Sequence, residues 1–74
     1  MPRTFNGYRL RLERRRCGIS VHDLAARIGR TCWTLYGYET GRQQPPLDIA
    51  DALAAVLDVP LDELLVAEDL PAVA

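Results

Sequence analysis

The chain has 74 residues, of which 49% are apolar, and its formal net charge is −1. This length suffices for one domain with a single core and leaves no room for a second, effector-sensing domain. No apolar run approaches the roughly 20 residues that cross a bilayer, and residues 1–6 lack the apolar stretch of a signal peptide. We therefore expect a cytoplasmic protein with no membrane segment.

The charged residues are divided unequally between the two halves of the chain. Residues 1–42 contain all nine arginines against three acids, a net charge of +6, whereas residues 43–74 contain seven acids and no base, a net charge of −7. The basic half can face phosphates while the acidic half faces solvent or a protein. A solvated surface without a ligand explains the charges equally well, so the motifs must decide.

The two cysteines and the single histidine match no metal-ligand spacing, so we expect no metal and no other cofactor. A disulfide is not expected in a reducing cytosol. Cys17 is interpreted as a core residue and His22 as a solvent-facing one. Cys32 lies at a predicted helix start, where a redox switch is the weaker alternative to a passive thiol. No nucleophile and base are predicted to converge, so the interpretation is a protein that is not an enzyme.

The first two predicted elements are helices, and no segment of the chain shows the alternation of a β-strand. The first helix covers about residues 6–17 and stops at Gly18. Ser20 then caps the second helix, which Gly29 ends. The apolar stripe of this second helix consists of Leu24, Ala25 and Ile28.

Three further helices are predicted in the rest of the chain. Thr31 caps the third, which holds residues 32–39 and stops at Gly41. Pro46 suits the first turn of the fourth. A short fifth helix covers residues 61–65. The apolar stripe of the fourth helix is Leu47, Ala50, Leu53, Ala54 and Leu57. The whole chain, 1–74, is thus predicted as one all-α domain with a core over about 6–66 and a loose tail over 67–74.

The second and third predicted helices satisfy the requirement for a helix-turn-helix, which is two helices joined by a tight turn that contains glycine. Ala25 is small enough to let the helices approach, and Gly29 permits the turn. In such a motif the first helix crosses the DNA backbone and the second enters the major groove. The shared core would be formed by Leu24, Ile28, Leu35 and Tyr38.

The segment from about Gly7 to Leu65 resembles the Cro and phage-repressor family, also called the Xre-like helix-turn-helix domain, without gaps over about four-fifths of the chain. The resemblance implies a five-helix lambda-repressor-like fold and a transcriptional regulator, a repressor in type, that binds operator DNA as a homodimer. It rests on Gly18-Ile19-Ser20, Asp23-Leu24-Ala25, Ile28-Gly29, Tyr38-Glu39-x-Gly41, Pro45-x-Leu47 and the closing run of residues 57–65.

The same resemblance implies roles for individual residues. Arg14 and Glu39 would form an ion pair between the first helix and the end of the recognition helix, the alternative being two unrelated surface charges. The positions that read bases fall on Cys32, Trp33, Tyr36 and Gly37. None of these four can make a bidentate contact to a base, although the two aromatic rings can pack on thymine methyl groups.

Phosphate contacts are predicted around the recognition helix. Val21 stands where the family commonly has Gln, and free N–H groups at that helix start can still bind phosphate. The other candidates are Arg30, Thr31, Thr34, Arg42, Gln43 and Gln44. Each of them is also compatible with a solvated face. Four arginines of the first helix, whose direction is undecided, are Arg9, Arg11, Arg15 and Arg16.

The acidic half is predicted to carry the dimer interface. Ile49 and Val56 form a second stripe on the fourth helix, and Leu61 and Leu65 add apolar surface. The alternative is that the leucines after Pro60 only close the core of one chain. A competing function uses the same fold as a protein-interaction module, through the surface of Trp33 and Tyr36.

Overall fold

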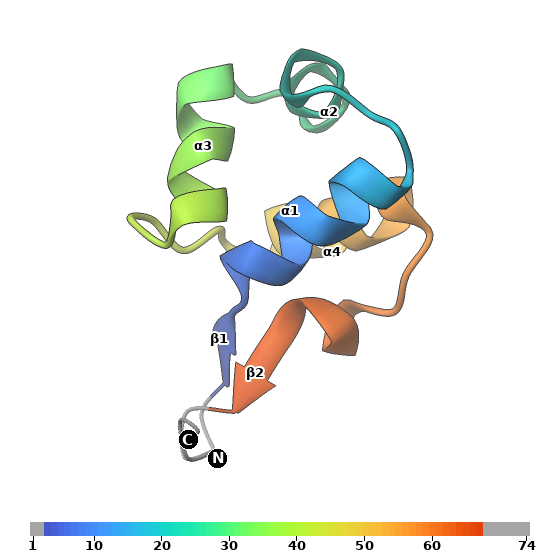
Figure 1. Cartoon of the computed structure of the whole chain (residues 1–74). Coiled ribbons are helices and arrows are strands. Elements are labelled where there is room, and N and C mark those ends of the chain that lie inside the picture. Colours follow the sequence, from blue (N-terminus) through green and yellow to red (C-terminus); the bar gives the residue numbers. More distant parts are fainter. Residues whose placement is uncertain (1–2, 68–74) are drawn as a thin grey trace.

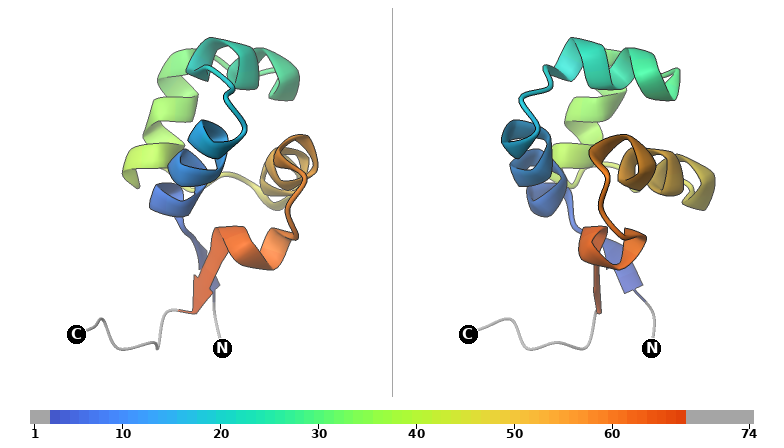
Figure 2. Two further views of the ribbon diagram at one scale, coloured as in Figure 1. Left: turned by 45° about the vertical axis from the view of Figure 1, so that its right-hand side comes forward. Right: turned by 90° about the vertical axis from the view of Figure 1, so that its right-hand side faces the viewer.

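The computed structural model describes residues 3–67 and contains four α-helices, one 3-10 helix and two short strands (Figure 1). In chain order the elements are β1 Arg3–Phe5, α1 Gly7–Arg16, α2 Val21–Ile28, α3 Cys32–Thr40, α4 Leu47–Leu57, η1 Leu61–Leu64 and β2 Leu65–Ala67. Both views of Figure 2 place α2 and α3 at one end of the molecule and the strands at the other. No helix within residues 3–67 is long and apolar enough to span a membrane.

The end of the chain differs from the predicted fifth helix. Residues Leu61–Leu64 form a 3-10 helix of only four residues, which is bounded by extended backbones at Pro60 before it and Leu65 after it. Leu65 instead begins β2, which pairs antiparallel with β1 in the register Phe5 opposite Leu65. The expectation of no strands was therefore wrong. Of the predicted tail, Ala67 belongs to β2, and residues 68–74 lie outside the described part.

The predicted boundaries of the first three helices are confirmed by their caps. The side chains of Asn6, Ser20 and Thr31 each accept a hydrogen bond from the backbone N–H three residues later. Such a bond satisfies one of the N–H groups that a helix start leaves without a partner. Gly29 ends α2 with a φ of 71°, a left-handed conformation that glycine adopts without a steric penalty. This residue therefore sets the turn between α2 and α3.

The core takes a fully buried leucine from every helix. These six residues are Leu10, Leu24, Leu35, Leu53, Leu57 and Leu64. On α4 the buried stripe also contains Ile49, only 7% exposed, whereas Leu47 at the helix start is 72% exposed. The predicted stripe was therefore wrong at both positions. Cys17 is also not a core residue, since it is exposed and its thiol donates to the carbonyl of Leu57 at 3.6 Å.

The start of α1 lies directly against the end of α3. A Cβ atom added at Gly7 would lie 2.7 Å from the carbonyl oxygen of Glu39 and closer still to that of Tyr38. Real Cβ atoms do not approach backbone oxygens so closely. Only glycine therefore permits the observed spacing of the two helices, a role that the sequence pattern did not predict.

Candidate nucleic-acid interface

α3 has an inner face that anchors it and an outer face that is available for binding. Leu35 and Tyr38 are buried in the core, whereas Trp33 is 66% and Tyr36 48% exposed. Cys32 and Thr34 are half-buried beside them. Together with α2 and the turn at Gly29–Thr31, this arrangement is that of a helix-turn-helix with two aromatic rings on the recognition face.

Gly37 does not belong to the exposed face, contrary to its predicted place among the base-reading residues. It is buried, and a Cβ atom there would lie 2.7 Å from Nε2 of Gln43. The N–H of Gln43 also donates to the Gly37 carbonyl at 3.1 Å. The absence of a side chain at Gly37 thus makes room for Gln43 to fold back onto α3.

The loop after α3 places the positive charge of Arg42 against the exposed face of α3. The guanidinium carbon of Arg42 lies 4.6 Å from the centre of the Trp33 ring. A contact of this kind stabilises an exposed pair by about 0.5–1 kcal/mol. The sequence predicted a phosphate contact for one residue and a base contact for the other, and the structure brings the two side chains together.

Several of the polar residues predicted to contact phosphates already form hydrogen bonds within the protein. The Gln44 side-chain carbonyl accepts from the N–H of Phe5 at 2.9 Å, which ties the loop to β1. Thr31 caps α3 and donates its hydroxyl to Thr34 at 3.1 Å, so Thr34 keeps a free hydroxyl hydrogen. Arg30 is exposed at the turn before α3, and within residues 3–67 its guanidinium donates a hydrogen bond to the adjacent carbonyl of Gly29 alone.

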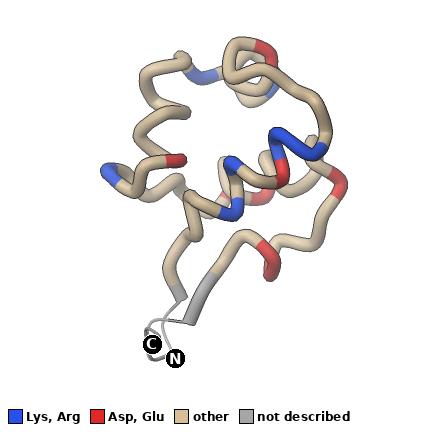
Figure 3. The backbone as a smooth tube through the Cα atoms, in the orientation of Figure 1, with Lys and Arg blue, Asp and Glu red and all other residues tan. Residues whose placement is uncertain are grey.

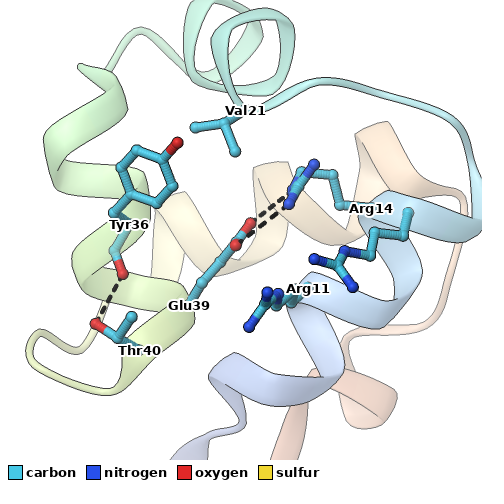
Figure 4. Close-up of a pocket in the computed structure, with 7 residues that line it drawn as sticks. Arg11, Arg14, Val21, Tyr36, Glu39 and Thr40 are labelled. Atoms are coloured by element: carbon cyan, nitrogen blue, oxygen red, sulfur yellow. Dashed lines mark hydrogen bonds and ion pairs between the residues drawn. The ribbon is translucent and has the colours of Figure 1, made fainter.

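Arg14 and Glu39 lie together where α1 meets the end of α3. The Nε of Arg14 donates to Oε2 of Glu39 at 2.7 Å (Figure 4), and its Nη1 donates to the Ile19 carbonyl at 3.0 Å. The two side chains are only 12% and 4% exposed. The pair therefore joins α1, α3 and the turn before α2, and the alternative of two unrelated surface charges is wrong.

A second network holds the other side of α1. Arg16 and Arg9 both donate to the Glu13 carboxylate, at 2.7 and 2.9 Å, and Arg9 also reaches Glu63 near the end of η1 at 2.9 Å. The hydrogen bond from Arg16 and, to a smaller extent, the hydrogen bond from Arg9 lower the pKa of Glu13. The resulting stabilisation is present above the ordinary pKa of a glutamate and is lost as the pH falls through the lowered value.

Pairing with carboxylates therefore sorts the arginines into two groups. Arg9, Arg14 and Arg16 are engaged within the protein. Among the side chains that the structure describes, those with no carboxylate partner are Arg11, Arg15, Arg27, Arg30 and Arg42. Figure 3 shows the basic positions along α1 and in the segments on either side of α3. The unpaired arginines are thus the ones free to bind an anion.

Two of the unpaired arginines line a cleft of about 370 Å³ between α1 and α3. Figure 4 shows Arg11 on the α1 wall of this cleft, with Tyr36, Glu39 and Thr40 on the α3 wall. The cleft is lined by Arg11, Arg14, Arg15, Val21, Tyr36, Glu39 and Thr40. Sequence reasoning left the direction of Arg11 and Arg15 open, but a signal existed: Arg11 lies three residues before Arg14, on the same helix face.

The fold, the exposed recognition helix and the basic cleft define a helix-turn-helix domain of the type found in DNA-binding transcription regulators. The chain belongs to this family, in its Cro and phage-repressor branch: the family model, described as a helix-turn-helix domain, matches residues 7–66. The chain is 40% identical over 50 residues to a protein of Pyrobaculum aerophilum named an HTH-type transcriptional regulatory protein. That match covers 68% of the chain but only 20% of the longer relative.

Two solved structures show the same fold. The crystal structure of SinR, a master regulator for biofilm formation in complex with DNA, has a TM-score of 0.72 and 30% identity, covering 78% of this chain and 97% of that one. The restriction-modification controller protein C.AhdI from Aeromonas hydrophila has a TM-score of 0.74 and 34% identity, covering 78% and 88%.

Proposed function

We propose that the chain is a sequence-specific transcriptional regulator that binds operator DNA as a homodimer and represses by occupying it. The observation that carries this proposal is the distribution of unpaired arginines around the exposed face of α3. Arg11 and Arg15 line the cleft on its α1 side, Arg30 precedes the helix, and Arg42 follows it. The similarity to SinR, which was crystallised with DNA, supports the same interpretation.

In the proposed complex α3 enters the major groove, and the arginines contact phosphates on either side of it. Free N–H groups at the start of α2, beside Val21, add a phosphate site of the kind that helix starts provide. Trp33 and Tyr36 have no bidentate pairing with any base. We therefore infer that they select base pairs through apolar contact with thymine methyl groups, which favours A·T steps in the operator.

The phosphate contacts are tested one arginine at a time. Replacing Arg11, Arg15, Arg30 or Arg42 by Ala is expected to weaken binding to all duplexes alike, because phosphates carry no sequence information. The slope of log affinity against log salt concentration should shrink by about one unit for each phosphate that the variant no longer neutralises. Arg16→Gln is the matched control, since its guanidinium is engaged by Glu13 and its removal should leave the slope unchanged. Unchanged slopes in all four alanine variants would contradict the assignment.

The proposed homodimer uses the acidic half, with a revised interface. Ile49 is excluded because it is buried within one chain, whereas Val56, Leu61 and Leu65 are half-buried and keep some apolar surface. A two-fold dimer would present its recognition helices to half-sites about 34 Å apart.

Sedimentation at tens of micromolar tests this interface. The wild-type chain is expected to sediment as a dimer, and Val56→Asp as a folded monomer, since a carboxylate buried without a partner strongly disfavours association. Leu12→Asp is the control, because it places the same charge on an exposed leucine of α1 outside the acidic half. A wild-type chain that stays monomeric and binds one copy per site would rule out the interface.

A further inference from the structure

The two thiols of the chain lie in chemically different surroundings. The sulfur of Cys32, the first residue of α3, is 3.1 Å from Nδ1 of His22 in the first turn of α2. Ten residues separate them in the chain, and the turn at Gly29 brings the two helix starts together. The expectation that no nucleophile and base converge was therefore wrong at this place. His22 is indeed exposed, and Cys32 is half-buried beside it.

Cys17 provides an internal comparison. It is the more exposed of the two thiols, but its partner is the carbonyl oxygen of Leu57, which cannot take up a proton as an imidazole nitrogen can. Cys17 also caps the C-terminal end of α1, where the helix dipole opposes negative charge, whereas Cys32 lies at the N-terminal end of α3, where it favours it. Both differences favour a reactive sulfur at Cys32.

We propose that Cys32 is a modification site for low-molecular-weight disulfides, with His22 as the base that activates it. The Cys32 sulfur attacks one sulfur of the disulfide while its proton passes to Nδ1 of His22. One S–S bond breaks and one forms, so that a mixed disulfide remains on Cys32. The leaving thiolate takes up the proton, and no further oxidant is required.

The consequence for DNA binding rests on the function proposed above. Cys32 lies between Thr31, which caps the recognition helix, and Trp33 on its exposed face. A peptide-sized adduct with net negative charge at this position would occupy the space of the duplex and repel its phosphates. Modification is therefore expected to release the protein from DNA, and a reducing agent is expected to restore binding.

The chemistry is tested without DNA, by treating the native chain with glutathione disulfide and following both cysteines by peptide mass spectrometry. Cys32 should react at least about tenfold faster than the more exposed Cys17, a threshold set below the roughly 10²–10⁴-fold that a positioned base contributes. His22→Gln should lower the Cys32 rate toward that of Cys17, while the Cys17 rate and the melting temperature stay unchanged. Equal rates in the wild-type chain, or a Cys32 rate unaffected by His22→Gln, would overturn the proposal.

A second arm measures DNA binding before and after treatment. The Cys17→Ser chain should lose binding on modification and regain it on reduction, whereas binding by the Cys32→Ser chain, whatever its level, should not respond to the disulfide. Undiminished binding by the modified chain would overturn the regulatory role of the site. A reduced chain that binds no DNA would instead overturn the proposed function, while the rates at Cys32 and Cys17 still decide the modification site.

Discussion

Replacing either Arg14 or Glu39 by an uncharged residue is expected to destabilise the folded chain by about 3–5 kcal/mol, the cost of leaving a buried charge without its partner. Burial is the reason for this size, since the two side chains are 12% and 4% exposed. The Ile19 carbonyl would also lose its guanidinium donor when Arg14 is replaced. An ion pair between two exposed side chains, by contrast, typically contributes about 1 kcal/mol or less.

A double-mutant cycle with Arg14→Met and Glu39→Gln, followed by urea unfolding, measures the coupling. The double variant should lose less free energy of unfolding than the two single variants together, because it leaves no charge without a partner. Arg16→Gln serves as the control and should cost clearly less, because the Arg16 side chain is 61% exposed and Glu13 keeps its hydrogen bond from Arg9. Additive single effects would show that the pair does not hold α1 to α3.

Gly7→Ala is expected to destabilise the chain by about 3 kcal/mol, an overpacking effect. The new Cβ atom would meet the backbone carbonyls of Tyr38 and Glu39, which cannot move aside as a flexible side chain does. The sign of this effect is diagnostic, since Ala in place of Gly within an unobstructed helix stabilises by roughly 0.5–1 kcal/mol.

Thermal and urea unfolding of Gly7→Ala measure the destabilisation, and Tyr8→Ala is the neighbouring control. Tyr8 is exposed, and its replacement should change the free energy of unfolding by no more than about 0.5 kcal/mol. The Gly7→Ala variant should also bind DNA less tightly than its folded fraction accounts for, because α1 and α3 line the same basic cleft. A Gly7→Ala chain as stable as the wild type would contradict the close approach.

The parts of the fold that depend on residues close together in the chain could be predicted from the sequence. Ser20 and Thr31 cap helices by bonding to the backbone three residues later, and Gly29 ends α2 by its own backbone conformation. These roles therefore follow from residue type alone. The strands could not be predicted in this way. Each has three residues, too few to show alternation, and β1 pairs with a segment at the other end of the domain.

In the candidate site, too, local features could be predicted from the sequence and contacts between distant segments could not. The motif identifies α3 as the recognition helix, and the exposure of Trp33 and Tyr36 follows from the inward direction of Leu35 and Tyr38. Which arginines remain unpaired depends on carboxylates distant in the chain, as the contact between Arg9 and Glu63 illustrates. The approach of Cys32 to His22 likewise depends on the angle between two helices, which composition and spacing do not define.

The most direct test of DNA binding is a titration of the wild-type chain with random-sequence duplex DNA over a range of salt concentrations. Binding at low salt is expected. Four arginine contacts per chain make eight per dimer, so raising the salt concentration from about 50 to 200 mM should reduce the affinity of the dimer on the order of a thousandfold or more. A domain that uses Trp33 and Tyr36 to dock a protein instead would bind no duplex at any salt concentration. The absence of binding at low salt would therefore contradict the proposed function.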